Sequence, residues 1–157
     1  MGESAEDRRW VREAIAIAGR AKEKGNRPFG ALLVSAEGAP LASGENSQLT
    51  DRQVLAHAEM NLLHRVVRDL APEVLAGSSL YTSAEPCAMC SGAIFWSGVG
   101  RLVFGLGGAR LHALAGSTPQ MLVASAREVL SRAGRRVEVV GPVLQEEAEA
   151  LFADGVF

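Results

Sequence analysis

Two short motifs place an imidazole, a carboxylate and two thiols at spacings that suit chemistry at a metal ion. They are H-A-E at 57–59 and P-C-A-M-C at 86–90. An imidazole and two thiolates are three of the four ligands that a tetrahedral Zn²⁺ takes, and a catalytic site keeps the fourth position for water. Zinc lowers the pKa of that water to about 7. We therefore expect His57, Cys87 and Cys90 to bind zinc, and Glu59 to carry protons beside it.

The C-x-x-C pair has two other interpretations, a redox-active dithiol or half of a structural zinc knuckle. The chain contains only two cysteines, which excludes a disulfide framework. A thioredoxin-like motif follows the first strand of a βαβ pattern, whereas this pair follows the third expected strand. The upstream H-x-E motif and Pro86 favour a catalytic zinc site.

The spacing of these residues restricts the elements that position them. Cys87 and Cys90 are three positions apart, so both fit on one face of the first turn of a helix. His57 and Glu59 differ by about 200° around a helix, so both reach one ion only where a helix begins. Two facing helix starts with the ion between them satisfy both spacings. His64 lies about 10 Å further along the first of these helices, too far to bind the same ion.

The hydrophobic pattern predicts alternating helices and strands. Helices are expected at 6–24, 57–70, 86–96, 119–133 and 142–154, and strands at 29–35, 40–46, 80–83, 101–105 and 136–140. The glycine-rich stretch 106–116 is left unassigned, and His112 within it has no expected partner. In helix 57–70 we expect Met60, Leu63, Val67 and Leu70 on the buried side. The alternation favours one central sheet with helices on both faces.

Composition indicates one soluble globular domain over residues 1–157. The chain is 48% hydrophobic and 22% charged, and its net charge of −2 does not favour binding to nucleic-acid phosphates. No apolar run approaches the roughly 18 residues of a membrane span. The acidic residues 1–7 are unlike a secretory signal, and two free thiols suit a reducing compartment, so we expect a cytoplasmic protein.

These residues resemble the cytidine-deaminase-like superfamily, above all its branch of guanine deaminases and tRNA adenosine deaminases. The resemblance runs through P-F-G-A at 28–31, G-E-N at 44–46, H-A-E at 57–59 and L-Y-T-S-A-E-P-C-A-M-C-S-G-A-I at 80–94. It implies a three-layer α/β/α sandwich around a five-stranded mixed sheet, usually dimeric. It also implies zinc on His57, Cys87 and Cys90, with Glu59 as the proton shuttle of a hydrolytic deamination that releases ammonia.

The resemblance implies substrate contacts as well. Asn46 would hydrogen-bond the base, and the alternative is that it is only a turn residue. Phe29 would line the pocket, and a position in the hydrophobic core is equally compatible with the sequence. Backbone groups of Ala58 and Ser83 would contact the ring. Trp96, in an aromatic pair like that of guanine deaminases, would stack on a purine or else pack at a helix end.

By the same resemblance, we expect the C-terminal segment to reach back over the pocket. In some guanine deaminases the segment that does so belongs to the partner subunit. Glu147 would supply a catalytic carboxylate there, and Glu146 is the second choice. The alternative is that both residues lie on a solvated face of the last helix. Phe157 would either close the pocket or fray. Glu85, just before the metal-binding motif, is expected to support it rather than take part in the chemistry.

The leading hypothesis is a zinc-dependent hydrolytic deaminase of guanine or a related aminopurine, aminopyrimidine or aminotriazine. The expected partners are a small-molecule substrate and a second copy of the chain, and the two copies can exchange their C-terminal segments. We expect no association with a membrane. A tRNA adenosine deaminase is the alternative, but the acidic residues at 146–154 and the lysine-free stretch 106–110 disfavour RNA. A zinc-binding protein without turnover is the third hypothesis.

Overall fold

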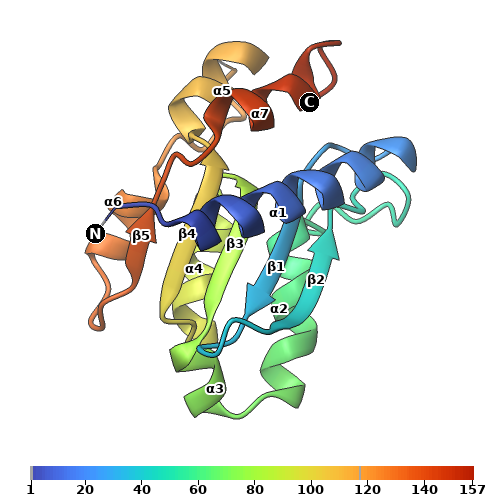
Figure 1. Ribbon diagram of the computed structural model, residues 1–157. Helices are drawn as coiled ribbons and strands as arrows, with labels where there is room; N and C mark the ends of the chain where they lie inside the picture. The colour runs from blue at the N-terminus through green and yellow to red at the C-terminus, as the bar shows by residue number, and fades with distance from the viewer. Residues whose placement is uncertain (1, 117) are drawn as a thin grey trace.

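A mixed five-stranded sheet runs through the centre of the protein (Figure 1). The computed structural model describes residues 2–116 and 118–157. The strand order is β2-β1-β3-β4-β5, in which β1 is antiparallel to β2 and β3, while β3, β4 and β5 are parallel. The strands are β1 Gly30–Val34, β2 Pro40–Glu45, β3 Ser79–Ala84, β4 Arg101–Leu106 and β5 Glu138–Val140.

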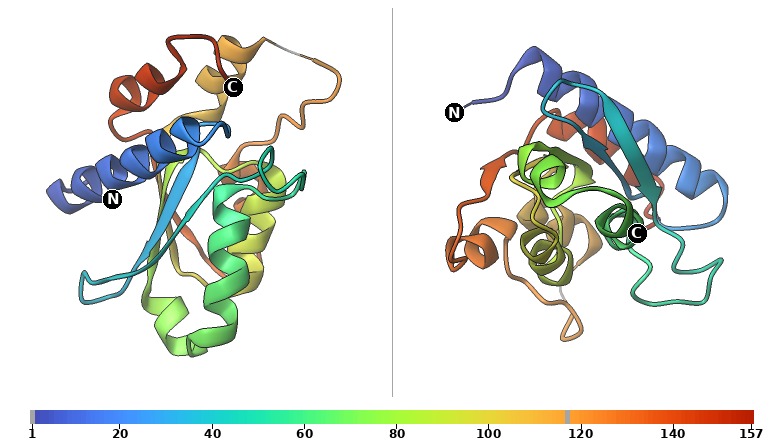
Figure 2. Two further views of the ribbon diagram at one scale, coloured as in Figure 1. Left: turned by 90° about the vertical axis from the view of Figure 1, so that its right-hand side faces the viewer. Right: turned by 90° about the horizontal axis from the view of Figure 1, so that it is seen from below.

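Helices cover both faces of the sheet, which confirms the predicted α/β/α architecture. The helices are α1 Ala5–Glu23, α2 Ala58–Asp69, α3 Pro72–Gly77, α4 Ala88–Ser97, α5 Gly108–Ala115, α6 Ala126–Ser131 and α7 Gln145–Glu149, followed by the 3-10 turn η1 Ala150–Phe152. Helix α1 lies on one face and helices α2 and α4 on the other (Figure 2). Among the described residues, no helix has both the length and the apolar character that spanning a membrane requires.

Helix α1 begins with a capping box and packs closely on the sheet. The Ser4 side chain accepts from the Asp7 backbone N–H, and the Asp7 carboxylate accepts from that of Ser4. A stripe of residues faces the sheet, namely Trp10, Val11, Ala14, Ile17 and Ala18. A Cβ on Gly30 would lie 2.5 Å from the Ala14 carbonyl oxygen, so glycine allows α1 to rest on the start of β1.

On the opposite face, the start of α2 lies against the end of β2. A Cβ on Gly44 would lie 2.4 Å from the Ala58 carbonyl oxygen, so only glycine permits this approach.

The prediction for the buried face of α2 was partly wrong. Val67 is 45% exposed, whereas Val66, the residue before it, is buried. Leu62, which was not expected on the buried side, is buried as well. Packing of α2 against β1, β2 and α4 sets this rotation, and the pattern of apolar residues alone does not reveal it.

The helices differ from the sequence prediction in four further places. Helix α6 spans Ala126–Ser131 rather than 119–133, because Ser125 forms a capping box with Glu128 and starts the helix there. The glycine-rich stretch that was left unassigned contains α5. Helix α3 was not predicted, because Pro72, which was expected only to end the preceding helix, also begins α3. The expected helix 142–154 is confined to α7 and η1.

One edge of the sheet collects the segments that carry the chemically interesting residues. The amino end of β1 meets the carboxyl ends of β2 and β3, as the pairs Gly30–Glu45 and Ala31–Thr82 show. The carboxyl end of β4 lies at the same edge, with Ala84 paired to Leu106. Ligands of open α/β sheets bind outside the carboxyl ends of the strands.

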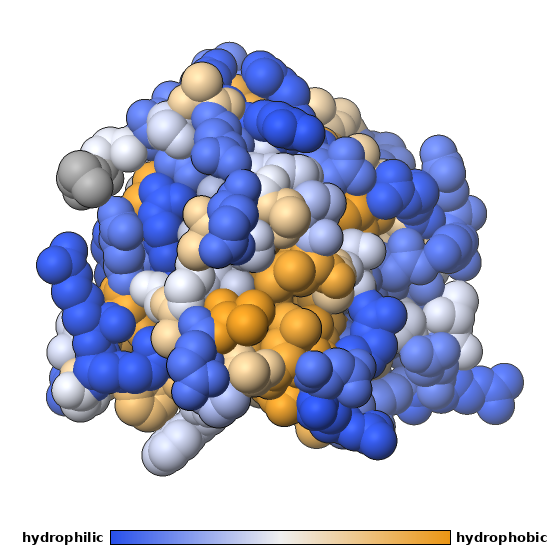
Figure 3. Space-filling view, turned by 60° about the horizontal axis from the view of Figure 1, so that its bottom comes forward, coloured by the Kyte–Doolittle hydropathy of each residue, from blue (hydrophilic) through white to orange (hydrophobic). Residues whose placement is uncertain are grey.

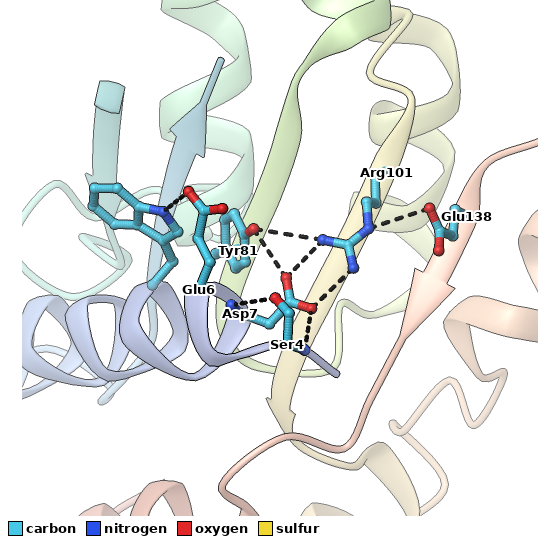
Figure 4. A network of polar contacts seen from close by, with 7 residues as sticks. Ser4, Glu6, Asp7, Tyr81, Arg101 and Glu138 are labelled. Atoms are coloured by element: carbon cyan, nitrogen blue, oxygen red, sulfur yellow. Dashed lines mark hydrogen bonds and ion pairs between the residues drawn. The ribbon is translucent and has the colours of Figure 1, made fainter. Parts of the chain in front are cut away.

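A buried ion pair fastens α1 to the middle of the sheet (Figure 4). Asp7, which is 1% exposed, accepts two hydrogen bonds from Arg101 of β4 at 2.7 and 3.0 Å and one from the Tyr81 hydroxyl of β3 at 3.0 Å. Burial opposes ionisation of Asp7, but these hydrogen bonds outweigh it and lower its pKa from 3.8 to about 2. Burial and the neighbouring Asp7 raise the pKa of Tyr81 to about 12.

Asp7→Asn should lower the free energy of unfolding at pH 7 by about 2 kcal/mol, the value of the pKa shift. Since the folded-state pKa is depressed, this stabilisation is present above pH 3.8 and is lost as the pH falls through about 2. Urea unfolding of both proteins between pH 7 and pH 2 measures the difference. Glu3→Gln, which removes the exposed pair with Arg8, is the control. A constant difference across this range would contradict the assignment.

Candidate metal centre

His57, Cys87 and Cys90 converge at the sheet edge. Their ligand atoms all lie within 4.8 Å of one another. His57 Nδ1 lies 3.6 Å from Cys87 Sγ and 3.5 Å from Cys90 Sγ. Zinc bonds of about 2.0 Å to nitrogen and 2.3 Å to sulfur, at a tetrahedral angle, separate the two atoms by about 3.5 Å. The three residues are therefore positioned to bind a metal ion, and the separations suit zinc.

Two helix starts hold this cluster, as the spacing predicts. His57 is the N-cap residue of α2, and Cys87 is the N-cap residue of α4. Cys90 therefore lies in the first turn of α4, while Pro86 precedes the N-cap rather than lying inside the helix. Neither N-cap side chain caps its own helix, so both are free to face the cluster. The positive ends of two helix dipoles meet there and favour thiolate over thiol.

The protonation of the three groups shows what a cation would replace. A hydrogen bond from the Cys90 thiol, together with His57, lowers the pKa of Cys87 to about 4 despite burial. The hydrogen bond to Cys87 and burial raise the pKa of Cys90, and the hydrogen bond with Cys87 raises that of His57. A divalent cation that binds here would displace the protons of Cys90 and His57.

Glu59 lies beside the three metal-binding groups without belonging to them. It occupies the first turn of α2 and is 8% exposed. Burial raises the pKa of Glu59, and the charge of Cys87 acts in the same direction. A carboxyl group that exchanges its proton near neutral pH needs such a raised pKa. Its position therefore suits proton transfer.

Asn46 lies in a hydrogen-bonded network that extends from the end of β2. Its side chain is buried, donates to Gln48 Oε1 at 2.7 Å and accepts from the Gln48 backbone N–H at 3.1 Å. Arg27 also donates to Gln48 Oε1, at 3.0 Å, and Gln48 Nε2 donates to the Val54 carbonyl. These bonds engage both ends of the Asn46 amide and fix its orientation. Sequence reasoning missed Arg27 and Gln48, which carry no motif of their own.

The other predicted substrate contacts lie at the same edge with one exception. The Phe29 carbonyl accepts from the Asn46 N–H at 3.0 Å, and the Phe29 ring packs against Phe152. Ala58 is the first residue of α2, and the Ser83 hydroxyl accepts from the Gly30 N–H. Trp96 is the exception, since it lies at the far end of α4 from Cys87 and is 83% exposed.

The predicted acidic residues of the C-terminal segment point elsewhere. Glu147 accepts two hydrogen bonds from Arg12 of α1, at 2.7 and 2.9 Å, and Glu146 is exposed. Within one chain, neither carboxylate is brought to the metal-binding cluster. Phe157 does return to the sheet edge, where its ring stacks on Phe152 and its carbonyl oxygen accepts from Arg27.

Glu85 links the metal-binding loop to two other helices. Its two carboxylate oxygens accept from the Gly108 N–H at 2.7 Å and the Ala126 N–H at 2.9 Å, the first residues of α5 and α6. An anion at a helix start satisfies unpaired N–H groups and complements the helix dipole. Glu85 therefore supports the loop that carries Cys87, as expected, and fixes α5 and α6 beside it.

Comparisons with known proteins agree with this arrangement. The family model for the cytidine and deoxycytidylate deaminase zinc-binding region matches residues 4–106. The chain is 40% identical to a probable cytosine deaminase of Schizosaccharomyces pombe, over 92% of this chain and 89% of that protein. It is 34% identical to a tRNA-specific adenosine deaminase of Bacillus subtilis, over 94% and 87% respectively.

A solved structure gives the same result for the fold. The guanine deaminase from Nitrosomonas europaea superposes with a TM-score of 0.76 and 25% identity, over 98% of this chain and 86% of that one. The match to the family model, the relatives and the convergent His57, Cys87 and Cys90 lead to one conclusion: this chain belongs to the cytidine and deoxycytidylate deaminase family.

Proposed function

We propose that the protein is a zinc-dependent hydrolytic deaminase that releases ammonia from a small amino-heterocycle. The observation that carries this proposal is the three-ligand cluster of His57, Cys87 and Cys90 beside a buried carboxylate that is not one of the ligands. Three ligands leave one tetrahedral position for water, whereas a structural site would use a fourth residue. Among the described residues, no fourth His, Cys, Asp or Glu joins the cluster.

The residues divide the reaction between them. When bound, the cation acidifies a water molecule for attack on the ring carbon that bears the amino group. Glu59 accepts a proton from that water and delivers it to the adjacent ring nitrogen, and then carries the second proton, from the hydroxyl now on the ring carbon, to the departing amine. Water and the aminated ring thus become the oxo ring and ammonia. Asn46 and the backbone at Ala58 and Ser83 orient the ring, while Phe29 contributes an apolar wall.

Guanine or a related aminopurine is the substrate class that we favour. The fold matches a guanine deaminase over nearly the whole chain, and the net charge of −2 offers little attraction for an RNA backbone. Cytosine is the second candidate, because a relative named as a probable cytosine deaminase is 40% identical over 92% of the chain. Both substrates are free bases with an amino group on an amidine-like carbon, so one cluster suits either of them.

We also propose a homodimer that uses the exposed face of α4. Met89, Gly92 and Trp96 are spaced along one side of this helix, and none of the three is buried. Apolar side chains gather on the surface that carries α3 and the end of α4 (Figure 3). A tryptophan exposed on such a surface is typical of an interface between proteins.

Cys87→Ala should lose the bound metal and much of the stability, because metal binding at such sites contributes folding free energy. Metal content per chain of the purified variant, measured by mass spectrometry, tests this. His64→Ala, on the exposed side of α2, is the matched control for His57→Ala and should keep a full equivalent. Full metal content in Cys87→Ala or His57→Ala would remove those residues from the ligand set.

Glu59→Gln should keep its metal and lose at least about a hundredfold in kcat, the usual contribution of a positioned acid–base group. Ammonia release from guanine, 2,6-diaminopurine, cytosine, adenine, their nucleosides and aminotriazines should be measured with both proteins. We expect wild-type turnover of a free base. Inosine formation in tRNA with no release from any free base would instead support the tRNA enzyme, and no turnover at all would support a zinc-binding protein without activity.

Trp96→Glu should convert the dimer to a monomer, because it places a charge in an apolar interface. Light scattering after size-exclusion chromatography gives the mass of each species. Leu41→Glu, a charge at an exposed leucine of β2, is the control and should stay dimeric. A monomeric wild-type protein would contradict the proposed interface.

A further inference from the structure

The loop between β2 and α2 joins Asn46 to the first metal-binding residue. The Ser47 N–H donates to the Ala56 carbonyl at 3.1 Å, so Asn46 and His57 flank one backbone hydrogen bond. Asn61 of α2 also donates to the Ser47 hydroxyl, at 2.9 Å. The loop therefore holds Asn46 at the start of α2.

Gln48 lies buried inside this loop and bonds three of its neighbours. Its backbone N–H donates to Asn46 Oδ1 at 3.1 Å, and its Oε1 accepts from Asn46 Nδ2 at 2.7 Å. Gln48 Oε1 also accepts from Arg27 at 3.0 Å, while Gln48 Nε2 donates to the Val54 carbonyl at 2.7 Å. Both side-chain amides thus use both of their ends.

The groups that bound this network have fixed donor and acceptor roles. A guanidinium and a backbone N–H only donate, and a backbone carbonyl only accepts. Arg27 therefore requires the oxygen of the Gln48 amide, and the Val54 carbonyl requires its nitrogen. If the Asn46 amide turned over, its oxygen would meet Gln48 Oε1 and its nitrogen would meet the Gln48 N–H, so both bonds would be lost. The network thus allows a single orientation of the Asn46 amide.

Arg27 connects this network to the C-terminal segment. Its Nε donates to the Phe157 carbonyl oxygen at 3.1 Å. The Phe157 ring stacks on Phe152 with 5.3 Å between the ring centroids, and the Phe152 ring lies 5.6 Å from that of Phe29. The Phe29 carbonyl in turn accepts from the Asn46 N–H at 3.0 Å. These contacts form a closed circuit, so the guanidinium of Arg27 is itself held in place.

We propose that Gln48 is a positioning residue of the site and that Arg27 acts through it, so that the Asn46 amide presents one fixed edge to the substrate. The proposal rests on the proposed function, in which Asn46 orients the ring. An amide has two N–H groups and two oxygen lone pairs, and the bonds to Gln48 use one of each. One N–H and one lone pair of Asn46 are left for the ring, and a reversed amide would exchange their places. A side chain held in advance in one orientation also reduces the entropy cost of binding.

Gln48→Met tests this role, because methionine is similar in length but offers only a weak acceptor to Asn46. The KM for ammonia release from guanine should rise about tenfold, the usual effect of one lost hydrogen bond to a buried group. The kcat should change less than about threefold, since ring binding is weakened alike in the ground state and the transition state. Gln48→Glu keeps an acceptor for both Asn46 and Arg27, so its KM should stay within about threefold of the wild-type value.

Thr50→Ala is the matched control in the same loop. It removes hydrogen bonds of Thr50 with Asn26 and with the Ser47 carbonyl, none of which involves Asn46, and should leave the KM within about twofold. Arg27→Met is the second variant. It keeps Gln48 but frees its amide to turn over, so it should raise the KM by a smaller factor than Gln48→Met. An unchanged KM in both Gln48→Met and Arg27→Met, or an equal rise in Thr50→Ala, overturns the proposal.

Hydrogen exchange measures the orientation of Asn46 without any turnover. In the zinc-loaded wild-type protein, NMR should find the Asn46 side-chain N–H that bonds Gln48 protected from exchange, and Gln48→Met should speed this exchange about tenfold. Equal exchange rates in the two proteins overturn the proposal. A protected Asn46 amide in a wild-type protein that releases no ammonia from any base contradicts the proposed function and not the role of Gln48.

Discussion

The starts of α2 and α4 meet with three ligand atoms inside 4.8 Å, where Cys90 is buried and His57 and Cys87 are half-buried. In this contact the hydrogen bond with Cys90 lowers the pKa of Cys87, while protons stay on His57 and Cys90, whose pKa values are raised. A divalent ion replaces those protons and neutralises both thiolates. The contact also has Glu59 beside it, buried in the first turn of α2.

The backbone of the sheet imposes this contact rather than merely allowing it. Gly44 removes the Cβ that would otherwise push the start of α2 away from β2, and Gly30 does the same for α1 on the other face. Glu85 then secures the side toward β4, since its carboxylate joins the starts of α5 and α6 to the loop that carries Cys87. The metal-binding loop is thus held by strand packing on one flank and by charge–dipole interactions on the other.

The spacings within the metal-binding motifs predicted the local geometry of the site. The spacings of His57 with Glu59 and of Cys87 with Cys90 require helix starts, and both helix starts are present. The predicted helix start at 119 was wrong, since the helix begins after Ser125, whose spacing to Glu128 is that of a capping box. The rotation of α2, which buries Val66 instead of Val67, depends on contacts with α4 and the sheet. No spacing encodes such contacts.

The same distinction explains which site residues escaped prediction. Gln48 and Arg27 act on Asn46 through contacts that only the folded loop creates. The two flanks of Cys87 therefore differ in chemistry, since Asn46 lies in a network of hydrogen bonds, whereas the cavity beside Pro86 and Cys87 is lined mainly by apolar side chains. A flat heterocycle with one strongly polar edge gains most when that edge faces the hydrogen-bonded flank, because burying polar atoms against apolar side chains costs free energy.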